Sequence, residues 1–108
     1  MRLLLDENLP KRLKQDFPEH KIFTVPDMQW NGIRNGELLQ LMVDNSFDVF
    51  LTYDKNLQHQ QNFLKYTITV FVLTATINRY TELTKLTGKI KNYLSNDQMS
   101  VRPIIISE

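Results

Sequence analysis

The sequence of 108 residues contains no cysteine, and it has only three glycines and four prolines. The absence of cysteine excludes a disulfide scaffold, thiolate-bound metals and a cysteine nucleophile. A chain of this length buries roughly two-thirds of the surface that it exposes when unfolded, so one domain spanning residues 1–108 is stable without disulfides. A chain without cysteine fits a reducing compartment, and we expect a cytoplasmic protein.

The sequence also lacks a long apolar run and an excess of charge of either sign. No stretch approaches the roughly 18 apolar residues of a membrane span, so we expect no membrane partner. The opening segment MRLLLDENLP reaches two carboxylates after three leucines, whereas a signal peptide needs roughly 7–15 apolar residues. Thirteen basic and twelve acidic residues give a formal charge of +1, so any affinity for RNA has to come from a local patch.

What the chain does contain is an alternation of strand and helix patterns. We predict strands over residues 3–5, 21–25, 48–52, 68–73 and 102–106. We predict helices over 37–43, 57–66 and 79–94, and one after Asn8 that this residue caps and that places Leu9, Leu13 and Phe17 on one face. Asn31-Gly32 and Asn35-Gly36 are typical of turns. Such alternation predicts an α/β fold with parallel strands joined by right-handed crossovers.

Acidic residues follow two of the predicted strands and begin one of the predicted helices. Asp6 ends the first strand, Asp54 follows the third, and Glu37 starts the helix that leads into the third strand. In a parallel sheet these positions meet at the carboxyl edge, where ligands bind. Clustered like charges are unfavourable unless a cation neutralises them, and oxygen ligands select Mg²⁺ or Mn²⁺. The pattern therefore predicts a divalent-metal site suited to phosphodiester hydrolysis.

Each of these residues also has an ordinary structural interpretation. An Asp after a strand often caps a helix or forms a turn, and a Glu near a helix start is favoured by the helix dipole. His20 and His59 share no predicted segment with the carboxylates, and we expect both at the surface. Trp30 either covers the core or stacks on a base.

Two motifs resemble the PIN-like family of compact nuclease-type domains, whose better-known relatives are the ribonuclease toxins of toxin–antitoxin pairs. LLLDENLP is similar to that family's apolar strand followed by Asp-Glu-Asn. VFLTYDKNL is similar to its Thr-x-Asp-x-Asp-Phe motif, and VPDMQWNGIRNGELL is similar to the intervening segment. Together these matches cover residues 2–57.

The resemblance implies a three-layer PIN-like fold with a small, mainly parallel central sheet. It implies a Mg²⁺- or Mn²⁺-dependent ribonuclease with Asp6, Glu37 and Asp54 as catalytic metal ligands, and with Asn8 and Thr52 as supporting groups. Such a chain would be the toxin-like component of a pair, with RNA as substrate and an antitoxin-like protein as partner; whether it forms a homodimer stays open.

The sequence departs from the family at two positions. Asn56 stands where the second motif has its second Asp, and Asn35 stands where an acidic residue precedes Glu37. An amide oxygen can bind a metal but brings no charge, so we expect a weaker metal site and a slow enzyme.

Two other functions compete with a ribonuclease. A catalytically weak PIN-like module that binds RNA or protein is favoured by the two asparagines. A phospho-receiver domain would also place Asp54 after its third strand, with Thr74 and Ala75 after the next. Only 20 residues separate Asp54 from Thr74, and the Lys-Pro expected after the last strand is missing.

Three basic residues lie near one another on the helix predicted over 79–94. Arg79, Lys85 and Lys89 form either a solvated charged face or a surface that contacts phosphates.

Overall fold

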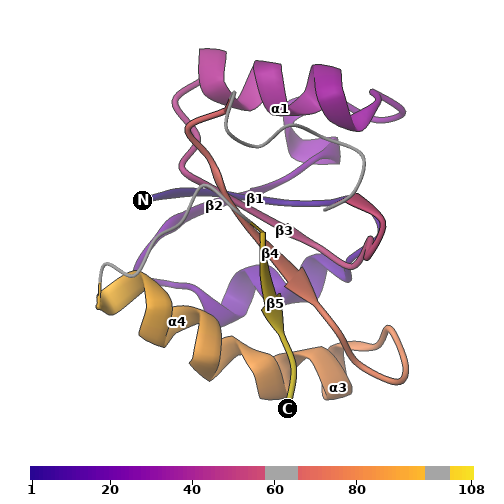
Figure 1. Cartoon of the computed structure of the whole chain (residues 1–108), viewed down its shortest axis with the longest axis vertical. Helices are drawn as coiled ribbons and strands as arrows, with labels where there is room; N and C mark the ends of the chain where they lie inside the picture. Colours follow the sequence, from indigo (N-terminus) through magenta and orange to yellow (C-terminus); the bar gives the residue numbers. More distant parts are fainter. Residues whose placement is uncertain (58–65, 97–102) are drawn as a thin grey trace.

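The computed structural model describes residues 1–57, 66–96 and 103–108. A five-stranded sheet, in which every strand is parallel to its neighbours, forms the middle layer (Figure 1). Its strands are β1 (Arg2–Leu5), β2 (Lys21–Thr24), β3 (Val49–Thr52), β4 (Thr69–Leu73) and β5 (Ile104–Ile106). The small α/β fold expected from the sequence is confirmed.

The strands are arranged in the order β2-β1-β3-β4-β5. The chain first moves outward from β1 to β2 and then returns to the other side of β1, so the direction of winding reverses between β1 and β3. In open sheets of this kind the ligand crevice lies outside the carboxyl ends of the two strands at that reversal. The topology therefore places the expected ligand crevice beside the residues that directly follow β1 and β3.

Helices cover both faces of the sheet (Figure 1). One face carries α1 (Asn35–Asp44) and the short 3-10 helix η2 (Pro26–Met28). The other carries the 3-10 helix η1 (Lys11–Asp16) and a helical stretch made of α3 (Tyr80–Leu83), η4 (Thr84–Leu86) and α4 (Thr87–Ser95).

The side chains of each strand alternate between two hydrophobic cores, as the period of an extended chain requires. Leu3 and Leu5 pack with the η1, α3 and α4 layer, whereas Leu4 packs with the α1 layer. Because both faces are covered, Leu3–Leu5 of β1 and all residues of β3 and β4 are buried, and these central segments are almost wholly apolar. On the face covered by η1, α3 and α4, Leu9, Leu13 and Phe17 are all buried, as their spacing predicts.

Two local predictions are wrong, and a third differs in detail. The segment after Asn8 is a 3-10 helix with Pro10 at its N-cap position, and Asn8 does not cap it. Asn35 and Gly36 form the first turn of α1 instead of a separate turn. The helix predicted over residues 79–94 is divided into three, with a 3-10 turn at Thr84–Leu86.

Other predictions have mixed outcomes. The turn at Asn31-Gly32 is present, since Gly32 has a φ of 77° that favours glycine. The strand predicted over 102–106 begins at Ile104, and the helix predicted over 57–66 and His59 lie almost wholly outside the described residues. Among the residues that the structure describes, no helix is both long enough and apolar enough to cross a membrane.

The carboxylate of Asp16 joins the two helical segments that share one face of the sheet. It accepts hydrogen bonds from the hydroxyls of Tyr80 (2.6 Å), Thr84 (2.7 Å) and Thr87 (2.9 Å). These contacts hold the middle of the helical stretch, including its 3-10 turn, against η1. Partial burial acts to raise the pKa of Asp16, but the three hydroxyls and the charge of Lys91 outweigh it and leave that pKa lowered.

We predict that Asp16→Ala lowers the free energy of unfolding by about 1–2 kcal/mol, the contribution of hydrogen bonds to a charged group reduced for partial exposure. Because the folded-state pKa is lowered, the contribution of Asp16 is complete above its unfolded pKa of about 3.9 and disappears as the pH falls through the folded value. Urea denaturation at pH 7 and near pH 3 measures both effects. Asp44→Ala, at the exposed end of α1, is the control; equal losses for the two variants, or an Asp16 effect independent of pH, would contradict this account.

Candidate functional site

The register of β1 and β3 places Asp6 opposite Thr52. Leu5 pairs with Leu51, and the backbone N–H of Asp6 donates to the carbonyl of Leu51 at 2.9 Å, so the ladder continues one residue beyond β1. Leu4 faces the α1 layer, and Asp6 and Thr52 share that face because side chains alternate along a strand. The two polar side chains therefore meet at the carboxyl edge, next to the reversal in strand order.

The carboxylate of Asp6 is buried and held by two donors. The residue is 9% exposed; its Oδ2 accepts the Thr52 hydroxyl at 2.7 Å and its Oδ1 accepts the Glu7 backbone N–H at 2.8 Å. Burial raises the pKa of Asp6; the two hydrogen bonds oppose this rise, and the negative charges of Glu7 and Asp54 add to it. Within the described part of the chain, no basic side chain forms an ion pair with Asp6.

Asp54 is linked to Asp6 through the same hydroxyl. The Asp54 backbone N–H donates to Thr52 Oγ1 at 3.0 Å, so this buried oxygen accepts from one strand end and donates to the other. The Asp54 side chain accepts the Asn56 backbone N–H at 3.0 Å and lies 3.5 Å from the Asn35 amide nitrogen. The first turn of α1 therefore borders this edge.

Asn8 positions loops around the carboxylates. Its side-chain oxygen accepts the Tyr53 backbone N–H at 3.5 Å, and its carbonyl accepts the Asn78 amide at 2.6 Å. The loop after β1 is thereby tied to the loops after β3 and β4, which is a supporting role other than the helix cap expected from the sequence.

Glu37 is not joined to the other two carboxylates. It is exposed in the first turn of α1, and the described residues give its side chain neither a hydrogen bond nor an ion pair. Over residues 1–57, 66–96 and 103–108, no group of three or more Asp, Glu, His or Cys side chains is placed to hold a metal ion. The structure thus brings together Asp6 and Asp54, with Thr52, Asn35 and the backbone of Asn56.

A pair of carboxylates fits a Mg²⁺ or Mn²⁺ ion in one respect. Mg²⁺ is usually bound by one or two carboxylates, with waters and substrate phosphates as its remaining ligands. Asp6 is a buried acid without a cationic partner in the described structure, and a bound cation would remove the cost of ionising it there. Asp6 and Asp54 are therefore the residues that could hold such an ion.

Several residues that the sequence singled out lie away from this edge. His20 is half-buried at the opposite end of the sheet, where burial lowers its pKa. Trp30 packs on the α1-side core, with its ring 5.8 Å from that of Phe47, as expected of a core cover. On the charged face, Lys85 pairs with Glu82 at 3.1 Å and Lys89 donates to the carbonyl of Ser107.

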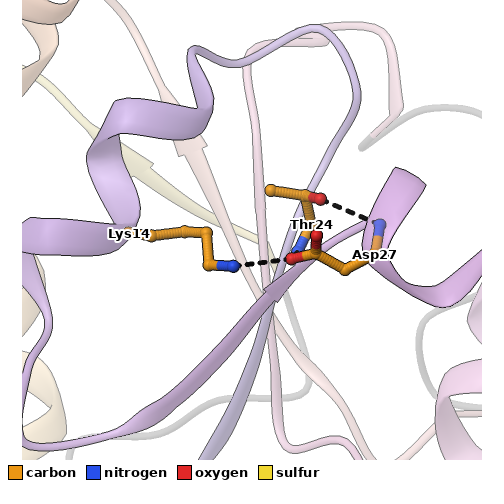
Figure 2. A network of polar contacts seen from close by, with 3 residues as sticks. All are labelled: Lys14, Thr24 and Asp27. Atoms are coloured by element: carbon orange, nitrogen blue, oxygen red, sulfur yellow. Dashed lines mark hydrogen bonds and ion pairs between the residues drawn. The ribbon is translucent and has the colours of Figure 1, made fainter.

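A further polar group at the end of β2 was not anticipated from the sequence. Asp27 accepts the Thr24 backbone N–H (2.9 Å) and the Lys14 ammonium (2.7 Å), while its own N–H donates to the Thr24 hydroxyl (3.0 Å), as Figure 2 shows. The Lys14 contact and the backbone N–H lower the pKa of Asp27. The Pro-Asp pair after the strand marks this turn in the sequence, but the lysine comes from a distant segment.

Comparisons of the chain with protein-family models, with curated proteins and with solved structures found no match. The resemblance to PIN-like domains therefore depends on the motifs within residues 2–57, and the function has to be argued from the site.

We predict that Thr52→Val destabilises the protein by about 1–3 kcal/mol, although valine has nearly the same shape, because a buried oxygen of Asp6 and the N–H of Asp54 lose their partner. Thr52→Ser keeps the hydroxyl, so it should retain most of the stability that the two hydrogen bonds contribute. Chemical denaturation of the three proteins measures the difference. If Thr52→Val were as stable as the wild type, the bridging hydroxyl would not hold this edge together.

Proposed function

We propose that the chain is a Mg²⁺- or Mn²⁺-dependent ribonuclease whose reaction takes place at Asp6 and Asp54. The observation that supports it most is the buried Asp6 carboxylate, which lies beside a second carboxylate at the reversal of strand order and has no cationic partner in the described structure. A crevice at that point is where open α/β sheets bind ligands.

In this proposal, each residue at the edge has its own role in binding the ion. Asp6 and Asp54 would hold the ion, while the Thr52 hydroxyl and the Glu7 backbone N–H each fix one oxygen of Asp6. When bound, the ion activates water and neutralises charge on the phosphate. The motif resemblance supports Glu37 as a third ligand, although its exposed side chain is not joined to Asp6 or Asp54 in the described structure. The backbone N–H of Asn56 orients Asp54 from the other side.

The biological setting that we propose is a toxin-like nuclease in the cytoplasm that an antitoxin-like protein restrains. The motif resemblance supports this setting. A small reading frame next to the gene, whose product binds the chain and blocks cleavage, would provide the test. The neutral side chains of Asn35 and Asn56 support the alternative, a PIN-like module with weak or no catalysis that binds RNA or protein.

A phospho-receiver domain shares the observed strand order, which is that of flavodoxin-like sheets. Two observations disfavour it. The Thr74 hydroxyl already donates to the carbonyl of Ile106 at 2.9 Å, and Ser107 and Glu108 follow β5 where a receiver would have a lysine. Incubation with a small phosphoryl donor and Mg²⁺ separates the two: addition of a phosphoryl group to Asp54, seen by mass spectrometry, would favour a receiver.

We predict that Mn²⁺ stabilises the protein by preferential binding to the folded state. At ten times its dissociation constant the gain is about 1.4 kcal/mol, or roughly 6 °C in melting temperature. Asp6→Asn and Asp54→Asn should abolish the shift, while Asp44→Asn, remote on α1, should retain it. Glu37→Gln should reduce the shift if Glu37 is a ligand. No shift in the wild type at millimolar Mn²⁺ would favour the inactive module.

We predict slow, metal-dependent cleavage of single-stranded RNA. Asp54→Asn should lower the rate by more than about 100-fold, since even the outer partners of a metal site account for about 10–100-fold. Asn56→Asp should bind Mn²⁺ more tightly and cleave faster, because it places a carboxylate next to Asp54. Cleavage rates and melting curves of the same preparations separate lost activity from unfolding. If Asn56→Asp changed neither affinity nor rate, residue 56 would lie outside the site.

A further inference from the structure

Two hollows flank the acidic pair along the carboxyl edge. The first, of about 340 Å³, lies beyond β1 and β2, and its lining includes Asp6, Lys11 and Thr24. The second, of about 420 Å³, lies beyond β3, β4 and β5, and its lining includes Lys55, Thr76 and Ser107. The strand order puts Asp6 and Asp54 between them.

Each hollow is lined by one lysine that has no ion pair or hydrogen bond within the described part of the chain. Lys14, Lys85 and Lys91 form ion pairs, and Lys89 donates to a carbonyl. In contrast, neither Lys11 nor Lys55 forms an ion pair or a hydrogen bond with any described residue, and both are exposed. The cations that border the acidic pair are thus free to bind a phosphate.

The other charged residues that line the two hollows are all acidic, but not all of them are available to oppose a lysine. In the first hollow, Asp27 is bound to Lys14, which neutralises it (Figure 2), so the exposed carboxylate that opposes Lys11 there is that of Glu7. In the second, Glu108 is an acidic lining residue that opposes Lys55. Removing the negative charge of Glu108 should therefore change RNA binding in the opposite direction from removing the positive charge of Lys55.

We infer that a single-stranded RNA lies along the carboxyl edge across the strands, with a phosphate on one side of the cleaved bond at Lys11 and one on the other side at Lys55. The row from β2 to β5 has four strand intervals of about 4.8 Å, or about 19 Å, enough for several nucleotides. Asp6 is only 9% exposed, so the phosphate has to approach it closely, which suits a flexible strand better than a rigid duplex. The inference rests on the proposed ribonuclease function.

The test is the salt dependence of binding of a fluorescent ten-nucleotide RNA, measured in Ca²⁺, which takes oxygen ligands. Each phosphate contact contributes about 0.7 to the slope of log affinity against log salt for a single strand. Lys11→Gln and Lys55→Gln should each reduce the slope by about 0.7. Lys21→Gln is the matched control, because Lys21 is also exposed and unpaired in the described structure but lines the hollow at the amino edge. Glu108→Gln should tighten binding, and a duplex of the same sequence should bind more weakly.

The outcomes distinguish the proposed RNA path from the proposed ribonuclease activity. Unchanged slopes for Lys11→Gln and Lys55→Gln, an equal loss in Lys21→Gln, preferred binding of the duplex, or no affinity of the wild type for RNA would each overturn the path. Cleavage is assayed separately in Mn²⁺ with the same variants. If the lysine variants show the predicted loss of slope but the protein does not cleave RNA, the RNA path is supported and the ribonuclease function is overturned. If the protein cleaves RNA but the variants keep the wild-type slope, the ribonuclease function is supported and the RNA path is overturned.

Discussion

The hydrogen bond between the Thr52 hydroxyl and the Asp6 carboxylate is the interaction on which the edge of this sheet depends. Thr52 is fully buried, and its oxygen also accepts the N–H of Asp54, so one atom fixes the ends of two neighbouring strands. An acid with 9% exposure would otherwise face the full cost of desolvation. Two donors reduce that cost without removing it, and the pKa of Asp6 stays raised. The edge thus keeps a buried carboxylate whose desolvation is incompletely compensated.

Parallel pairing of the strands brings the polar residues that follow β1 and β3 to the same edge of the sheet. Every strand ends at the same edge, so the polar residues after β1 and β3 are neighbours although 48 positions separate Asp6 from Asp54. The distribution of cations follows the same geometry. Lys14, Lys85, Lys89 and Lys91 are paired with a carboxylate or a carbonyl. Lys11 and Lys55, which lie beside the acidic pair, have no such partner among the described residues. An acidic centre with unpaired cations on both sides complements a metal ion and a phosphate chain better than either alone.

The parts of the fold predicted from the sequence are those that short-range patterns determine. The apolar run at Leu3–Leu5 indicates a strand buried on both faces, and two such strands suffice to place Asp6 and Asp54 at one edge. The 3-10 turn within residues 79–94 is hydrogen-bonded to Asp16, a residue far away in the chain, and no local pattern reveals that contact. The position of Glu37 depends likewise on where α1 begins, two residues earlier than its apolar spacing indicates.

The most direct measurement of the central claim is a Mn²⁺ titration followed by two-dimensional NMR of the backbone amides, because the paramagnetic ion broadens signals near its binding site. The account predicts that the amides of Glu7, Asp54 and Asn56 broaden first, at Mn²⁺ concentrations far below the protein concentration, and that Asp54→Asn prevents this. Broadening that begins elsewhere, for example at Glu19 or Glu82, or that is uniform over the surface, would contradict a cation site between β1 and β3.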